Sequence, residues 1–414
     1  MFDRSRIPVA ARLAGLGGAL LLAAGSALPA FAAAAVSGDS IVVPEGSAPT
    51  IATVDAARWS LAAASELAAA VDAASGEGLR SVDYRPAALR RAIANGEGAV
   101  LDATAEATAL ALAHDYLLGR VDGREALDWY IRPNAPEAAA LPAALDAARA
   151  AGNLTAFLTA LLPGDPRYAA LRSALATTSD PAERNVIRAN MERWRWMPRS
   201  LGASYLYVNV PSYRLEVVDA GAVSSTYTVV VGAPDTPTPQ LASDTSSLVV
   251  NPWWNVPQSI VKKSAMRPGR AGFIFKASAG GWQVRQPPGP RNSLGRIKFN
   301  LVNDQAIYLH DTPAKALFAR NERALSHGCI RVKNIDQLAG ELMREGEQPE
   351  RLDDALAGTE TKTLRLPRNW PVYLVYFTID QAQDGRLIRY GDPYGRDAAV
   401  IARLDGAAMQ VASN

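Results

Sequence analysis

The hydrophobic periodicity of this 414-residue chain changes near residue 203, and this change constrains the fold more than any other feature. Residues 54–200 carry apolar side chains at helical spacing among strong helix formers. From residue 203 the pattern alternates, as in SYLYVNVPSYRLEVVDAGAVSSTYTVVVG. The chain is therefore predicted to be α+β, with an all-helical domain followed by a mostly-β domain that contains short helices.

Turn and cap residues set the expected element boundaries. A helix is expected to begin at Pro86 and stop at Asn95-Gly96, and another to begin at Asp180-Pro181 and end at Pro198. In the second half, turns are expected at Pro211-Ser212 and Ala220-Gly221, and one clear helix at 334–346. Later strands are predicted at 247–250, 272–276, 281–285, 297–301, 306–309 and 372–379.

The first 32 residues have the layout of a secretory signal peptide. Arg4, Arg6 and Arg12 precede an apolar stretch at 13–28, and Pro29-Ala30-Phe31-Ala32 supplies an A-x-A site. Cleavage after Ala32 is favoured over a retained anchor, because the stretch is short for a membrane span. We therefore expect an exported protein, and no transmembrane span after signal removal.

The charge balance is nearly neutral, with 43 Lys and Arg against 41 Asp and Glu. A protein that binds nucleic acid usually carries a basic cluster, and the sequence shows none dense enough. Nucleic acid is therefore not expected as a partner.

The only cysteine, Cys329, lies within twenty positions of His310 and His327. Exported proteins usually pair their cysteines in disulfides, so a single cysteine is either an inert buried thiol or a reactive one. A thiol becomes nucleophilic when a base or a positive neighbour favours the thiolate. The spacing alone leaves open which histidine is the base.

Neighbouring residues suit the same chemistry. Gly328 allows an unusual backbone angle and close approach of a substrate, and consecutive N–H groups there could face a developing oxyanion. Arg331, two positions after Cys329, could bind a substrate carboxylate. A zinc site made by the cysteine, both histidines and Asp311 is less favoured, because no C-x-x-C or H-E-x-x-H spacing is present.

The segments HDTP and SHGCIRVKN resemble the signature of the L,D-transpeptidases of bacterial cell walls. In that signature a His is followed, after about fifteen residues, by Ser/Thr-His-Gly-Cys, and here fifteen residues separate His310 from Ser326. The segments NMERWRWMPR, VVVGAPDTPTP and PVYLVYFTID resemble the larger, Gram-negative branch of the family. The resemblance covers residues 180–397 closely and the helical region more loosely.

The resemblance implies a β-sandwich-like catalytic domain and a set of catalytic roles. Cys329 would be the nucleophile and His310 the base. The backbone carbonyl of Asp311 would orient His310. The backbone N–H groups of His327, Gly328 and Cys329 would frame the oxyanion site.

The resemblance also implies substrate-binding residues and a reaction. These residues are Arg331, Ser326, Tyr308 and Trp254. The thiol would form a thioester with the diaminopimelate of one peptidoglycan tetrapeptide stem, and a second stem would accept it in a 3→3 cross-link. Water as acceptor would make the protein a carboxypeptidase, and a lipoprotein lysine would make it an anchoring enzyme.

Other readings of the chain remain open. A cysteine peptidase acting on L,L bonds and a non-catalytic wall-binding protein are the alternatives. The family implies a periplasmic enzyme, associated with the cell wall and with cell shape, that needs no metal or organic cofactor and is acylated by carbapenems.

Two departures from the family pattern bear on substrate affinity and acceptor choice. No peptidoglycan-binding module interrupts the chain near residue 178, and the expected substrate cap at 256–286 is short. The predicted domains are a signal peptide (1–32), a linker (33–50), a helical scaffold (51–200), a catalytic domain (203–397) and a C-terminal tail (398–414).

Overall fold

The computed structural model describes residues 58–132, 135–344, 349–382 and 384–406. The predicted signal peptide and linker lie outside these residues. Within the described part of the chain, no helix combines the length and apolar character needed to cross a bilayer.

The first half is helical, as predicted, and its helices begin where the cap signals place them. Helix α7 has Asp180 as its N-cap, whose side chain accepts from Ala182 N, and α2 begins at Pro86. The helices are α1 (Leu61–Ala73), α2 (Pro86–Ala94), α3 (Ala99–Leu118), α4 (Ala135–Ala150), α5 (Leu154–Ala160), α6 (Pro166–Thr177) and α7 (Pro181–Arg195). Short 3₁₀ helices lie at Ala74–Glu77, Ser81–Tyr84 and Arg124–Leu127.

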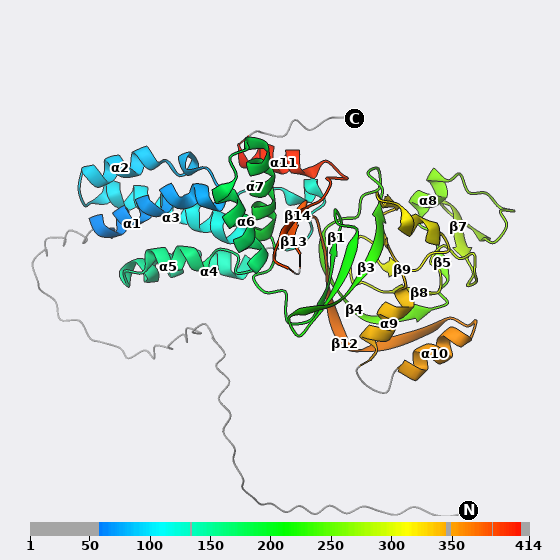
Figure 1. The fold of residues 1–414 in the computed structure, drawn as a ribbon. Coiled ribbons are helices and arrows are strands. Elements are labelled where there is room, and N and C mark those ends of the chain that lie inside the picture. Colours follow the sequence, from blue (N-terminus) through cyan, green and yellow to red (C-terminus); the bar gives the residue numbers. More distant parts are fainter. Residues whose placement is uncertain (1–57, 133–134, 345–348, 383, 407–414) are drawn as a thin grey trace, which may run out of the picture. The chain divides into compact units, whose positions relative to one another are not determined.

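The second half is built on one nine-stranded sheet in the order β10-β3-β11-β9-β8-β4-β12-β1-β2 (Figure 1). The sheet closes on itself, because β3 also pairs with β2. The two faces expected of a sandwich-like domain therefore belong to a single hydrogen-bonded sheet. Its strands are β1 (Tyr205–Asn209), β2 (Arg214–Asp219), β3 (Ala222–Gly232), β4 (Leu241–Val250), β8 (Ile297–Phe299), β9 (Leu309–His310), β10 (Ala324–Ser326), β11 (Ile330–Val332) and β12 (Lys362–Val375).

A second, three-stranded sheet occupies the segment predicted as the cap. It contains β5 (Trp254–Asn255), β7 (Gly281–Gln286) and β6 (Ile274–Ser278), and helix α8 (Gln258–Lys263) precedes β6. Val256, Val261, Met266 and Val284 form a small separate core. The cap is therefore a subdomain with its own packing.

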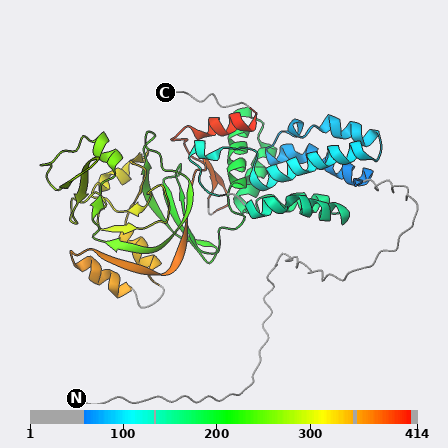
Figure 2. The same ribbon diagram turned by 180° about the vertical axis from the view of Figure 1, so that it is seen from behind.

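The C-terminal end of the chain returns to the helical half, which corrects one prediction. The expected tail at 398–414 contains most of helix α11 (Arg396–Leu404), whose Val400 and Leu404 are buried in the core of the helical half. The hairpin β13 (Ile379–Gln381) and β14 (Leu387–Arg389) contacts α6 and α7 through β13 (Figure 2). The amphipathic pattern of α11 is buried against α7, so this segment is structural.

Three further expectations differ from the structure. The strand predicted at 306–309 is limited to Leu309–His310, because residues 303–308 form a turn held by the Asn303 side chain. The helix predicted at 334–346 spans Ile335–Leu342 (α9). Two short helices, α8 and α10 (Pro349–Ala357), were not expected, and a 3₁₀ turn lies at Lys315–Ala319.

Candidate active site

Cys329, both nearby histidines and Arg331 line one cavity of about 430 Å³. Strands β9 and β11 are parallel neighbours, with Leu309 opposite Ile330 and His310 opposite Arg331. Strand β11 begins one residue after Cys329. The register therefore brings Cys329 close to His310, although the two residues are nineteen positions apart in the sequence. The cavity therefore unites the thiol, an imidazole and a guanidinium.

His310 is buried and its tautomer is fixed by one contact. Its Nδ1 lies 2.5 Å from the carbonyl oxygen of Asp311, so Nδ1 carries the proton and donates to that oxygen. Nε2 is then the ring nitrogen with a free lone pair. The contact predicted between the Asp311 carbonyl and His310 is present.

The side chain of Asp311 is itself held in place. Its Oδ2 accepts from Arg296 N at 2.9 Å, and its Oδ1 binds the Lys315 ammonium. Gly295, at φ +60°, lies so close that a Cβ there would fall 2.2 Å from Asp311 Oδ2. These contacts fix the backbone that orients His310, a role for this side chain that the sequence did not indicate.

The electrostatic setting favours an uncharged thiol and imidazole. Burial, aided by the positive charge of Arg331, lowers the pKa of His310 to about 3. Burial raises the pKa of the Cys329 thiol, although contacts with Tyr308 and the charges of Lys298 and Arg331 oppose that rise. Both groups are therefore neutral at neutral pH.

The loop that carries the thiol is fixed by buried hydroxyl groups. Gly328 has φ +114°, a conformation open to glycine, and its carbonyl accepts from Thr238 Oγ1 at 2.6 Å. Ser326 Oγ donates to the carbonyl of Cys329 at 2.6 Å and accepts from Gly328 N at 3.1 Å. The N–H of Gly328 is thus used inside the loop, which leaves those of His327 and Cys329 as the candidate oxyanion donors.

Ser326 is 3 % exposed, and its hydroxyl serves the loop. A positioning role accounts for these contacts, whereas the direct substrate contact expected from the sequence stays a prediction. His327 is exposed beside the thiol, and burial, Lys263 and Arg331 together lower its pKa. Among the residues that the structure describes, its ring has no carbonyl partner of the kind that fixes His310.

Arg331 has the properties expected of an anion-binding group. Its Nε is buried without a hydrogen-bond partner, and within the described ranges it makes no ion pair. Burial lowers the pKa of its guanidinium. A half-buried cation without a counter-ion is incompletely solvated, so a carboxylate entering the cavity would gain a charge-assisted contact.

Tyr308 lines the cavity next to His310, and Lys298 packs against the Tyr308 ring. The Tyr308 ring centroid lies 5.5 Å from that of His310, and Lys298 Nζ lies 4.4 Å from the Tyr308 centroid. Lys298 is opposite His310 in the β8–β9 ladder, and burial lowers its pKa. No sequence motif marks Lys298, because its alignment with His310 depends on strand register.

The cap supplies the opposite wall of the cavity. Trp254, from β5, stands there with its ring centroid 6.4 Å from that of Phe273. Ile260, Lys263 and Met266 of the α8 region also line the cavity. The predicted wall residue Trp254 is therefore at the site.

No group of acidic, histidine and cysteine side chains suited to a metal ion occurs in the described residues. The zinc alternative would need Asp311 as a ligand, and its carboxylate is engaged by Arg296 and Lys315. The arrangement is suited to attack by a thiol on a carbonyl carbon, with a neutral imidazole as base and a guanidinium for an anionic substrate group.

Two family models match parts of the chain. Residues 203–361 match the family model YkuD, described as the L,D-transpeptidase catalytic domain, and residues 55–175 match the model described as Scaffold domain. A curated protein of Haemophilus influenzae named "Putative L,D-transpeptidase" is 33% identical over 221 residues. That alignment covers 47% of this chain and 45% of the relative, so the chain spans less than half of the relative's length.

Solved L,D-transpeptidase structures are similar at a lower level. One from Mycobacterium smegmatis is 12% identical with a TM-score of 0.25, over 42% of this chain and 58% of that chain. L,D-transpeptidase 3 from Mycobacterium tuberculosis is 13% identical with a TM-score of 0.23, over 42% and 61%. Similarity at this level does not bear on activity, and the assignment rests on the family models and the curated relative. The family models thus match residues 55–175 as a Scaffold domain and residues 203–361 as an L,D-transpeptidase catalytic domain.

Proposed function

We propose that the protein is a peptidoglycan L,D-transpeptidase that forms 3→3 diaminopimelate cross-links through a thioester on Cys329. One observation carries the proposal. Cys329 shares a cavity with a buried imidazole whose Nδ1 is committed to the Asp311 carbonyl and with the unpaired guanidinium of Arg331. This set provides a nucleophile, a base and an anion-binding group.

In the acylation step, the thiol proton passes to Nε2 of His310 while Sγ attacks the carbonyl carbon of diaminopimelate in a tetrapeptide stem. The resulting oxyanion faces the N–H groups of His327 and Cys329. The bond to D-alanine then breaks, and the His310 imidazolium gives its proton to the leaving amine. Because the resting pair is neutral, proton transfer accompanies attack.

In the second step, the side-chain amine of another stem's diaminopimelate attacks the thioester carbonyl. His310 takes a proton from that amine and returns one to the departing Cys329 sulfur. An amide between two diaminopimelates forms, and the free thiol is regenerated. Arg331 holds a carboxylate of the substrate during both steps.

Other acceptors use the same thioester. Water would release a tripeptide, and a lipoprotein lysine would give an anchored protein. A short cap excludes water less well, so hydrolysis is expected as a visible side reaction. The signal-like first 32 residues support a periplasmic location, next to the proposed substrate.

Incubation of the purified protein with disaccharide tetrapeptide separates these functions by product mass. The proposal predicts released D-alanine and a tetrapeptide–tripeptide dimer, with some tripeptide. Tripeptide without dimer would indicate a carboxypeptidase, and cleavage of L,L bonds would indicate a peptidase. Unchanged substrate would favour a wall-binding protein.

The pH dependence of kcat/KM follows from the neutral pair. Activity needs neutral His310, whose pKa is lowered to about 3, and a protonated thiol, whose pKa is raised by burial. Activity should therefore stay level from about pH 5 to pH 8 and fall only outside this range. Far-UV circular dichroism at each pH controls for unfolding. A decline above about pH 6.5 would point instead to a preformed thiolate–imidazolium pair.

Replacing Arg331 with Lys tests the carboxylate contact. The variant keeps a positive charge but loses the planar fork, so KM should rise about 10-fold while the thiol still reacts. D-alanine release measures the change, and Arg365→Lys, at an exposed position of β12, is the matched control. Unchanged kinetics in a folded Arg331→Lys protein would contradict substrate binding by Arg331.

A further inference from the structure

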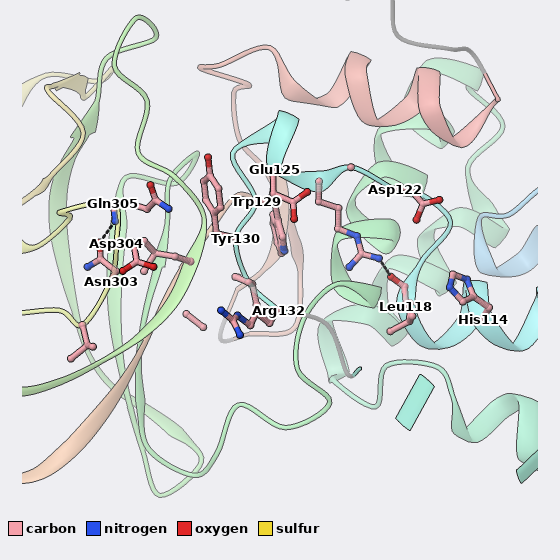
Figure 3. A pocket seen from close by; sticks show the side chains of 16 residues that line it. His114, Leu118, Asp122, Glu125, Trp129, Tyr130, Arg132, Asn303, Asp304 and Gln305 are labelled. Atoms are coloured by element: carbon pink, nitrogen blue, oxygen red, sulfur yellow. Dashed lines mark hydrogen bonds between the residues drawn. The ribbon is translucent and has the colours of Figure 1, made fainter. Parts of the chain in front are cut away.

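A second cavity, of about 590 Å³, lies next to the active site, between the helical half and the catalytic sheet (Figure 3). We call it the interdomain cavity. Its walls are the end of α3 and the following turn, the segment 129–132, and the loop 302–305, with Leu241 and Ala242 at the base. Its volume is within the range of ligand-binding pockets.

The interdomain cavity and the active-site cavity share one wall. Gln305 lines both, and the carbonyl of the next residue, Ala306, accepts from Cys329 Sγ at 3.7 Å. Asn303 fixes this wall, because its Oδ1 accepts from Gln305 N and Ile307 N at 3.1 and 3.0 Å. A ligand in the interdomain cavity would therefore lie one loop away from the thiol.

The opposite wall, formed by the segment 129–132, is hydrogen-bonded to the catalytic domain. Tyr130 N donates to the carbonyl of Gln240 at 2.7 Å, and Gln240 N donates to the carbonyl of Asp128 at 2.8 Å. Arg396 of α11 binds the side chains of both Gln240 and Asp128. These contacts hold the segment 128–131 in a fixed position.

The lining chemistry is amphipathic. The Tyr130 ring is 37% exposed, and Val302 is 79% exposed. Around these apolar groups, the Gln305 amide and the carboxylates of Asp122 and Asp304 are exposed, and Figure 3 shows Asp122 and Asp304 on opposite sides of Tyr130. Sugar rings present apolar faces and hydroxyl groups together, which an exposed tyrosine and polar side chains can match.

The interdomain cavity carries charges of both signs, because Arg124 and Arg132 line it together with three acids. Asp122, Glu125 and Asp304 make no ion pair within the described residues. The guanidinium of Arg124 is engaged by backbone carbonyls of Val121 and Leu118. Hydrogen bonds to carbonyls leave the charge of Arg124 in place, so these two cations offset most of the charge of the three acids. A site with little net charge offers little attraction to the carboxylates of a stem peptide and is compatible with a strand of uncharged N-acetylated sugars.

We propose that the interdomain cavity binds the glycan strand that bears the stem peptide, as a saccharide subsite next to the thiol. The inference rests on the proposed function. The proposed subsite explains two observations. The interdomain cavity shares Gln305 with the active site, and its lining is compatible with an uncharged carbohydrate.

The first test is direct binding. The full-length protein is titrated by calorimetry with an oligosaccharide of four β-1,4-linked N-acetylglucosamine units. Saturable binding is expected, weakened about 3- to 10-fold in Tyr130→Ala, because an aromatic contact contributes about 0.5–1.5 kcal/mol. Tyr390→Ala, a half-buried tyrosine on another cavity, is the control and should bind like the wild type. Absence of binding, or equal binding by Tyr130→Ala, would overturn the proposal.

The second test compares KM for tetrapeptide linked to a glycan with KM for free tetrapeptide. Tyr130→Ala should raise KM for the linked substrate about 3- to 10-fold and leave KM for the free peptide and kcat unchanged. An unchanged ratio of the two KM values would contradict the subsite. Release of D-alanine from free tetrapeptide tests the proposed function separately, because that substrate does not reach the interdomain cavity.

Discussion

Cys329→Ala is expected to abolish D-alanine release and cross-linking, with a loss on the order of 10⁶-fold. The sequence contains no second thiol, and a thiol is a stronger nucleophile near neutral pH than the hydroxyl groups that also line the cavity. The half-buried thiol is exchanged for a smaller apolar group at the end of a loop held by Ser326 and Thr238. The variant should therefore remain folded, and a thermal melt close to the wild-type value is the control.

A carbapenem provides an independent measurement on the same pair of proteins. The thiol should open the β-lactam ring, forming a thioester while the ring nitrogen takes the proton. Intact-protein mass spectrometry should show one adduct on the wild type and none on Cys329→Ala. An equal adduct on both proteins, or full cross-linking activity in the variant, would refute Cys329 as the nucleophile.

His310→Ala is expected to lower the acylation rate by about 10²–10⁴-fold. His310 has its Nδ1 committed to Asp311, so its Nε2 has a free lone pair and is the proposed base. The acylation rate is measured by stopped-flow mixing with a carbapenem across the pH range. In the variant the rate should rise with pH as the thiol ionises without assistance.

His327→Ala is the matched control for this experiment. His327 is exposed and keeps its backbone N–H when the side chain is removed. Its substitution should change the rate by less than about 10-fold, because only the ring is lost. A large loss in His327→Ala together with a small loss in His310→Ala would reverse the assignment of the base.

The sequence predicted helices and strands correctly where cap or turn residues mark the ends of the segment. Asp180-Pro181 begins α7, and the turns at Pro211-Ser212 and Ala220-Gly221 separate β1, β2 and β3 as expected. The segment 396–404 was misjudged because its apolar face is buried by α7, roughly two hundred residues earlier in the chain. The amphipathic pattern of this segment indicates a helix, but a local pattern does not show which distant element covers its apolar face.

The active-site residues also divide into those marked by a local motif and those brought in by long-range contacts. The spacing of His310 and Cys329 matched a known motif, so their placement in one cavity could be predicted. Lys298 reaches the site only through the β8–β9 register, and Gly295 only through its contact with Asp311. Such contacts depend on long-range pairing, which a single sequence does not reveal.

The most direct test of the central claim is to trap the acyl-enzyme formed with the natural donor. The wild-type protein is mixed with disaccharide tetrapeptide, quenched in acid, digested and examined by mass spectrometry. The account predicts a thioester on the peptide containing Cys329, with the mass of the substrate minus D-alanine. Turnover accompanied by an acyl group on another residue, or by no covalent intermediate under conditions that retain thioesters, would contradict it.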